Sequence, residues 1–167
     1  MSETVAGNSS DGSKRIYVLW AAGFAFLGLL AIFCVYFLRP CLEVRAAVRR
    51  INAGKGNCEG AVKALGGPEQ AAAKCALYVR LPERLATRED KNLAFGILDA
   101  CGQPAFPWLM SLLGSRDAYV RANAAWTLGK LKDPRAVEPL KALLTNPDSN
   151  VRKVAEAAIK KIEGAGP

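Results

Sequence analysis

The chain contains no histidine, which removes the commonest general base, imidazole metal ligation and the usual partner of a serine or cysteine nucleophile. Its five cysteines are separated by 7, 17, 17 and 26 positions, so no CxxC motif exists for zinc binding or thiol redox chemistry. The stretch AGKGN lacks the serine or threonine that follows the lysine of a phosphate-binding loop. Since the carboxylates are also scattered, we expect no enzyme activity, no catalytic residue, no metal and no cofactor.

One long segment lacks charge altogether. Residues 16–38 read IYVLWAAGFAFLGLLAIFCVYFL, and a helix of this length extends about 34 Å, enough to cross the hydrocarbon layer of a bilayer. A cleaved signal peptide has a shorter apolar region and a small-residue cleavage site, and a soluble core helix shows a polar stripe. We therefore predict a transmembrane helix over residues 16–38, preceded by a disordered polar tail over residues 1–15.

Small residues recur along one side of this predicted span. A helix with such a stripe allows another membrane helix to approach closely. The sequence thus allows self-association, or docking to a larger membrane assembly, through Ala21, Ala25, Gly28 and Ala31.

The remaining sequence repeats itself. Residues 117–131 read DAYVRANAAWTLGKL, and residues 148–162, 31 positions later, read DSNVRKVAEAAIKKI. The same offset also works backwards, pairing Leu128 with Ile97 and Leu140 with Leu109. A fixed period of this size is typical of stacked helical hairpins. We predict an all-α fold, with an α-solenoid of helix pairs over residues 58–163 and a flexible C-terminus over residues 164–167.

The residue pattern within each repeat unit predicts two helices. Val120, Ala124 and Leu128 fall on one helical stripe that faces inward, and Asp117 stands where an N-cap belongs. A second helix is expected over residues 134–144, after a tight turn at Lys132 and Asp133.

The segment of residues 120–159 closely resembles the HEAT-like repeats of the short bacterial, phycobilisome-lyase type. It reads VRANAAWTLGKLKDPRAVEPLKALLTNPDSNVRKVAEAAI. The resemblance is specific over about residues 90–162, and VKALGGPEQAAAKCALYVRLP resembles one more degenerate unit. Such proteins are mostly interaction scaffolds, so the resemblance implies a module that binds an unidentified protein. Arg121 and Arg152 match the signature arginine, which usually bonds within the stack. Together with the span, the resemblance implies a single-pass protein of the bacterial inner membrane.

The side of the membrane that holds the repeats stays open. Lys14 and Arg15 precede the span, whereas Arg39, Arg45, Arg49, Arg50 and Lys55 follow it, and this excess places the repeats in the cytoplasm. A short tail that ends in two basic residues before an apolar run is equally typical of an uncleaved signal anchor, which would export the repeats.

The sequence predicts that Cys58 and Cys75 lie close together. A helical hairpin that turns at Gly66 and Gly67 brings Cys58 beside Cys75, so a disulfide is geometrically allowed. The alternative is that both are small buried hydrophobic residues. A disulfide would favour an oxidising compartment.

Residues 39–57 are predicted to form a basic juxtamembrane helix and loop. Basic side chains this close to a bilayer gain about 1 kcal/mol each from an anionic leaflet. The candidates for contact with lipid are Arg39, Arg45, Arg49 and Arg50. The alternative is a solvated face that merely holds the domain away from the membrane.

Aromatic side chains provide candidate anchors for a protein partner. Trp126 is two residues, or about 200°, from Ala124, so it should point away from the core. Phe95 lies 31 residues earlier, and we expect the two rings to form a column on the first-helix face. Trp108, on the flank of its helix's apolar stripe, is a weaker candidate.

Three functions remain. The leading one is a membrane-anchored scaffold for protein–protein interaction, accessory to a membrane or envelope assembly. The alternative is a basic membrane-tethered module that binds a polyanion, because the formal net charge is +8; anionic lipid suits it better than nucleic acid. The third is a subunit that organises the active site of a partner enzyme.

Overall fold

A computed structural model describes residues 27–164, and within this range the chain is helical and contains no strand. The all-α prediction is therefore confirmed for these residues. The predicted tail, the first part of the predicted span with Ala21 and Ala25, and residues 165–167 lie outside the described residues. By its internal contacts the chain divides after Arg39 into two compact units.

The described part of the first unit is the end of the apolar segment. Residues 27–33 are α-helical, and a π-helical turn, Cys34–Leu38, follows. Its widening is explained by Pro40, which has no N–H and whose ring would clash with the carbonyl group of Tyr36 in a regular helix. The Arg39 N–H accordingly bonds to the Cys34 carbonyl oxygen, five residues back.

This apolar helix continues to Asn52, and the segment Leu27–Asn52 is long and apolar enough to cross a membrane. A signal sequence or the core helix of a soluble protein can meet the same criteria. Gly28 and Ala31 are both exposed on this helix. Association through the small-residue stripe stays a prediction, because half of the stripe lies outside the described residues.

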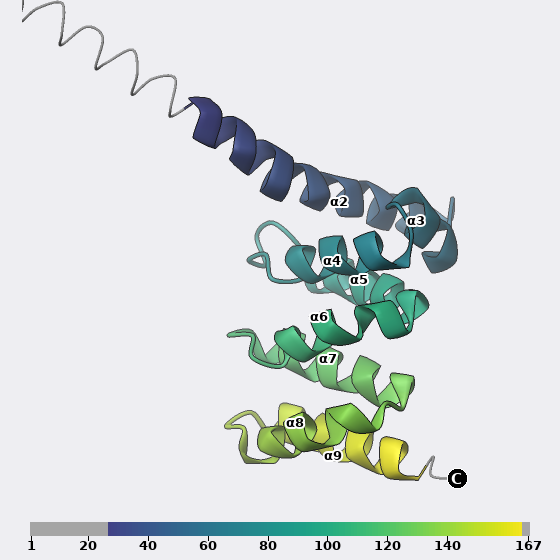
Figure 1. Cartoon of the computed structure of the whole chain (residues 1–167), viewed down its shortest axis with the longest axis vertical. Coiled ribbons are helices and arrows are strands. Elements are labelled where there is room, and N and C mark those ends of the chain that lie inside the picture. Colours follow the sequence, from purple (N-terminus) through teal and green to yellow (C-terminus); the bar gives the residue numbers. More distant parts are fainter. Residues whose placement is uncertain (1–26, 165–167) are drawn as a thin grey trace, which may run out of the picture. The chain divides into compact units, whose positions relative to one another are not determined.

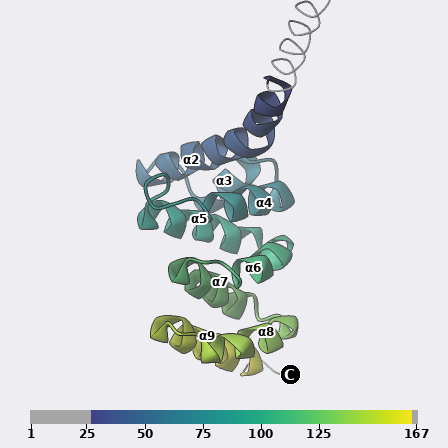
Figure 2. The same ribbon diagram turned by 90° about the vertical axis from the view of Figure 1, so that its left-hand side faces the viewer.

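The second unit consists of helical hairpins stacked along one direction (Figure 1). When the unit is turned by 90°, α5, α7 and α9 form one layer, and α4, α6 and α8 form the other (Figure 2). Short 3-10 helices precede α6 and flank α8. The elements are α2 (Arg39–Asn52), α3 (Cys58–Ala64), α4 (Pro68–Tyr78), α5 (Arg88–Cys101), η2 (Gln103–Ala105), α6 (Phe106–Leu112), α7 (Ala118–Leu131), η3 (Pro134–Ala136), α8 (Val137–Ala142), η4 (Leu143–Thr145) and α9 (Ser149–Glu163).

Side-chain caps determine where the first helix of each repeat begins. Thr87 and Asp90 form a reciprocal capping box at the start of α5. Asp117 accepts from the Tyr119 N–H at the start of α7, as predicted, and Asp148 caps α9 in the same way. The expected stripe is also confirmed, because Val120, Ala124 and Leu128 are fully buried.

The signature arginines hold the loops between repeats. Arg121 donates through Nη1 to the carbonyl oxygens of Ser115, at 2.8 Å, and Arg116, at 3.1 Å. Arg152 repeats the arrangement with Asn146, at 2.7 Å, and Pro147, at 3.0 Å. These carbonyl groups lie beyond the end of the preceding helix and need donors. The structural role expected for both arginines is confirmed.

The second helix of the repeat that begins with α7 is less regular than predicted. The segment expected as one helix over residues 134–144 consists of η3, α8 and η4. Pro134 and Pro139 lack N–H donors, so a continuous ladder of i to i−4 bonds cannot extend through the segment. The turn before it is as expected, with Lys132 in the left-handed conformation at φ 54°.

The N-terminal helices share the same core. Ala72, Cys75, Tyr78 and Val79 are buried in or just after α4, as the degenerate unit predicted. The apolar side of α2 is also buried, through Cys41, Val44, Ala47 and Val48. The basic segment was predicted as a juxtamembrane element preceding the solenoid. In the structure, α2 from Pro40 onward belongs to the same compact unit as the repeats.

Candidate interaction surface

Trp126 lies on the outer surface of α7. Its side chain is 51 % exposed although Ala124, Ala125, Thr127 and Leu128 around it are buried. The Lys161 ammonium group of α9 lies 5.1 Å from the centroid of the indole ring, at a distance typical of a cation–π contact. The outward orientation predicted for Trp126 is confirmed.

Phe95 does not continue this surface, and the expected aromatic column is wrong. Its ring is only 4 % exposed and belongs to the core. The reason is the register of the repeats. The N-caps Asp117 and Asp148 are 148 − 117 = 31 residues apart, but Thr87 and Asp117 are only 117 − 87 = 30 apart. Phe95 is therefore equivalent to the buried Ala125.

One residue of offset rotates a helical position by about 100°, enough to turn an outer side chain into the core. The additional residue lies in the turn after α7. Lys132 and Asp133 precede the second helix there, whereas Gly102 alone separates α5 from η2. The pairing of Leu128 with Ile97 is thus replaced by Leu128 with Leu98. The 31-residue offset holds for the second helices, where Leu109 and Leu140 are both fully buried.

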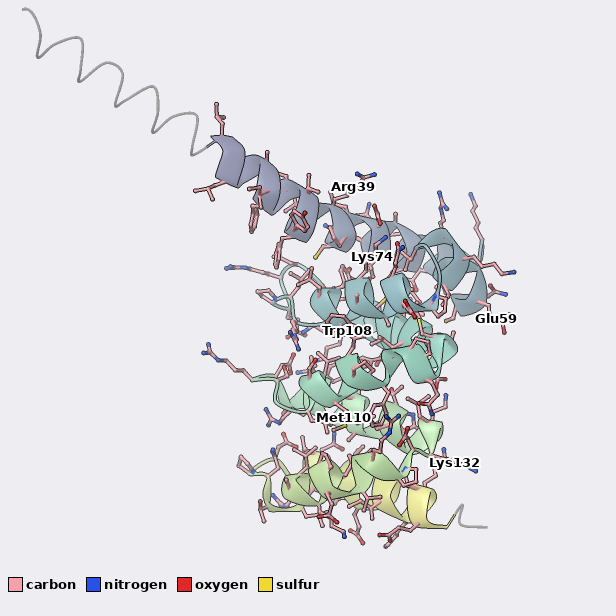
Figure 3. All side chains as sticks on the ribbon, viewed as in Figure 1. Arg39, Glu59, Lys74, Trp108, Met110 and Lys132 are labelled. Carbon is pink, nitrogen blue, oxygen red and sulfur yellow. The ribbon has the colours of Figure 1, made fainter. Side chains whose placement is uncertain are left out.

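Trp108 is exposed on the second-helix layer, on α6 (Figure 3). Its side chain is 39 % exposed. Pro139 of α8 occupies the equivalent position, 31 residues later, and is half-buried. The sequence interpretation missed this pair, although a 31-residue spacing applied to Trp108 would have found Pro139. Trp108 and Trp126 therefore belong to different layers.

Two ion pairs join α5 to α7 within the first-helix layer. The Lys91 side chain is almost fully buried, and its Nζ donates to Asp117 Oδ2 at 2.9 Å. Burial tends to raise the pKa of Asp117, but the lysine and the backbone amides of Tyr119 and Val120 outweigh it and hold that pKa below its usual value. Lys130 of α7 forms an ion pair with Asp99 of α5.

Comparison with protein-family models matches residues 79–160 to HEAT repeats. These residues, just under half of the chain, are thus similar in sequence to HEAT repeats. HEAT repeats generally mediate protein–protein interaction and are typically non-catalytic scaffolds. No significant match was found among curated proteins or solved structures.

Cys58, Cys75 and Cys101 are free thiols in this structure. Cys58 is half-buried and Cys75 fully buried, and this structure contains both as free thiols, so the disulfide between them stays a prediction. Burial raises the pKa of the Cys75 thiol, and the neighbouring Cys101 and Cys58 add to the rise. Burial also raises the pKa of Cys101 to about 11. Such thiols behave as small hydrophobic residues, the second alternative from the sequence.

The arginines proposed to contact lipid are all exposed on α2, namely Arg39, Arg45, Arg49 and Arg50. Leu42 is exposed, and the buried side centres on Val44 and Val48. The basic side chains therefore line the solvent-facing surface of a helix whose other side belongs to the core.

Proposed function

We propose that this protein is a membrane-anchored HEAT-repeat scaffold that binds protein partners, as an accessory to a membrane or envelope assembly. The observation that carries the proposal is the half-exposed indole of Trp126 on a helix whose neighbouring positions are locked in the core. An aromatic side chain held on a rigid helix loses little conformational entropy on binding, which makes it an effective interface anchor.

Trp108 supplies a second anchor on the other layer. The equivalent position of the next second helix holds Pro139, a half-buried apolar residue. Apolar side chains at one position of successive repeats provide an extended surface for a partner. The protein therefore carries one anchor on each layer, and we assign the stronger one to Trp126.

The membrane anchor is supported by the exposed apolar side chains of the first unit. They follow one another along the helix, which is unfavourable in water and favourable in lipid. The large hydrophobic residues exposed there are Leu27, Leu29, Leu30, Ile32, Phe33, Val35, Tyr36 and Leu38. Extraction of membranes with alkaline carbonate should leave the chain in the pellet, and its release into the supernatant would contradict the anchor. Protease treatment of intact cells would then establish which side holds the repeats.

Site-specific cross-linking tests the Trp126 site. A photoreactive phenylalanine analogue in place of Trp126 should yield a discrete cross-linked product in native membranes. The same analogue in place of Arg116, an exposed residue of a loop between repeats, serves as the matched control. Products of equal yield at both positions would contradict a specific site at Trp126.

The exposed arginines of α2 favour one further candidate function, contact with anionic lipid. The full-length protein in nanodiscs should show protection of Arg45 and Arg49 from a guanidine-selective reagent when phosphatidylserine is present. This protection should disappear as the salt concentration rises, because contacts with a charged surface are screened. Equal labelling in neutral and anionic discs would exclude this contact.

A further inference from the structure

A groove of about 350 Å³ lies between α2 and α3, within the second unit and away from both exposed tryptophans. Its volume is at the lower end of the range for ligand-binding clefts. The apolar part of its wall is formed mainly by small side chains, from Ala46, Ala47, Ile51, Ala61, Ala64 and Leu65.

The groove exists because the facing helices carry alanine where larger residues would fill the space. Ala47 and Ala61 are buried at its base, and Ala46 and Ala64 are exposed along its sides. Gly60 adds a further position without a side chain on α3. The helices are tied to the core elsewhere, through Val44 and Val48 of α2 and Val62 of α3, so the hollow does not close by collapse.

The charge around the groove is positive. Arg50 and Lys55 line it, both are exposed, and neither takes part in an ion pair within residues 27–164. Glu43 is the acidic residue of the lining, and its carboxylate accepts from Lys74 Nζ at 2.6 Å. Lys74 reaches from α4 toward α2 (Figure 3). The segment 39–57 as a whole has five basic residues and one acidic residue.

Backbone hydrogen bonds hold the loop that joins Arg50 to Lys55. The Lys55 N–H donates to the Arg50 carbonyl oxygen at 2.9 Å, and the Gly54 N–H donates to that of Ile51 at 2.9 Å. Gly54 adopts φ 68°, a conformation that favours glycine. Asn57 then caps α3 by accepting from the Gly60 N–H. The backbone that carries Arg50 and Lys55 is therefore ordered by contacts within the protein.

We propose that this groove is a second docking site, which takes an acidic segment of a partner protein. An apolar side chain of the segment enters between Ala46 and Ala64, and flanking carboxylates meet Arg50 and Lys55. A hollow of this volume accommodates one or two side chains, which suits a peptide anchor. Charge complementarity selects the partner, because Arg50 and Lys55 form no ion pair with a carboxylate of residues 27–164.

The test uses the full-length protein in neutral detergent and a fluorescent peptide with two leucines between pairs of glutamates. Fluorescence anisotropy should show saturable binding. Reversal of both rim charges, R50E with K55E, should weaken binding about tenfold or more. The matched control, R45E with R49E, makes the same change of net charge at arginines outside the groove lining and should weaken binding less than about twofold.

Two further variants separate the groove from general electrostatic attraction and from the tryptophan site. Ala46→Phe fills the groove from an exposed position, so it should abolish peptide binding while the helical signal is retained. Trp126→Ser should bind the peptide as the wild type does, whatever it does to cross-linking of native partners. The groove site and the Trp126 site can thus fail separately.

Other outcomes would overturn the proposal. These are equal loss in the two charge-reversed variants, equal binding of a peptide with serines in place of the leucines, and equal binding of one with lysines in place of the glutamates. A further overturning result is absence of peptide binding when phosphatidylserine vesicles bind the wild type and not R50E with K55E, since that would make the surface a lipid site. Peptide binding that follows self-association of the protein would likewise assign the groove to a second copy.

Discussion

The α5–α7 and α7–α9 interfaces join equivalent helices of successive repeats, yet different forces hold them together. Between α5 and α7, Lys91 is buried against Asp117, and Lys130 pairs with Asp99. Between α7 and α9, the described residues provide no ion pair. Instead, a Cβ atom added at Gly129 would lie 2.9 Å from both Cα and Cβ of Ala158.

The difference shows how one repeat plan tolerates two kinds of contact. Charged pairs are directional and fix the register of neighbouring helices, but burying them is costly. Small residues bring helix backbones together and gain dispersion contacts instead. The position of Gly129 is occupied by Asp99 in α5, so the α5 helix presents a carboxylate where α7 presents only backbone.

The outer position of the first helix also differs between the two repeats. With the 30-residue register, Gly96 of α5 is the equivalent of Trp126 of α7. A Cβ atom at Gly96 would approach Cys58 Sγ of α3 to 3.2 Å, so a neighbouring helix covers this position. At Trp126 the position is half open to solvent. On the first-helix layer, α3 therefore covers the position of Gly96, whereas the equivalent position of Trp126 is open to solvent.

The largest effect on stability is expected at Phe95, one of the two aromatic residues that the sequence analysis had paired. Phe95→Ala should lower the free energy of unfolding by about 3 kcal/mol, because it removes a buried ring and leaves a cavity. Trp126→Ala, the matched control, should lower it by about 0.5 kcal/mol, because the ring is exposed. Chemical unfolding in neutral detergent, followed by the helical circular-dichroism signal, measures both. Similar losses for the two variants would place Trp126 in the core and remove the basis of its proposed role.

This pair of residues also marks where prediction from sequence succeeded and where it failed. The helical stripe of Val120, Ala124 and Leu128, the cap at Asp117 and the hairpin at Gly66 and Gly67 all follow from local rules, and the structure confirms them. Local rules are reliable there because each involves residues close in the chain.

The failure at Phe95 arose from a single-residue difference in one turn. A 31-residue offset matched the second helices and was extended to the first helices, where Thr87 shows that 30 is correct. Apolar residues at several neighbouring positions of α5 made either register acceptable on hydrophobicity alone. The groove and the core role of α2 were missed for another reason, since both depend on contacts between segments that no repeat period relates.

Gly129 is the next test, because it distinguishes the close interface from the charged one. Gly129→Ala should lower the free energy of unfolding by about 2 kcal/mol, since the new methyl group would overlap Ala158 unless α7 and α9 separate. Gly114→Ala is the matched control, as its nearest atom, the Ser111 carbonyl oxygen, would be 3.9 Å away. Its stability should stay within about 0.5 kcal/mol of the wild type. An unchanged stability in Gly129→Ala would mean that the α7–α9 interface is not closely packed.

The smallest effect is expected at the charged interface. Asp117→Asn keeps a side chain able to cap α7 but leaves the buried Lys91 ammonium group without its carboxylate. The loss should be about 1 kcal/mol at neutral pH, a value kept low because the Asp117 side chain is 44 % exposed. Asp148→Asn is the matched control, because Asp148 caps α9 in the same way without a lysine contact, and it should cost less.

The pH dependence of stability in the same variants tests whether the charge of the Asp117 carboxylate stabilises the fold. The pKa of Asp117 is lowered in the folded protein, so its carboxylate contributes stability above the ordinary aspartate pKa of about 4, and this contribution disappears as pH falls through the lowered folded value. The wild type should therefore approach Asp117→Asn in stability when unfolding is measured at successively lower pH below about 4. A difference that persists undiminished in acid would show that the Lys91–Asp117 contact acts through packing, and the contrast between a charged and a close-packed interface would then no longer hold.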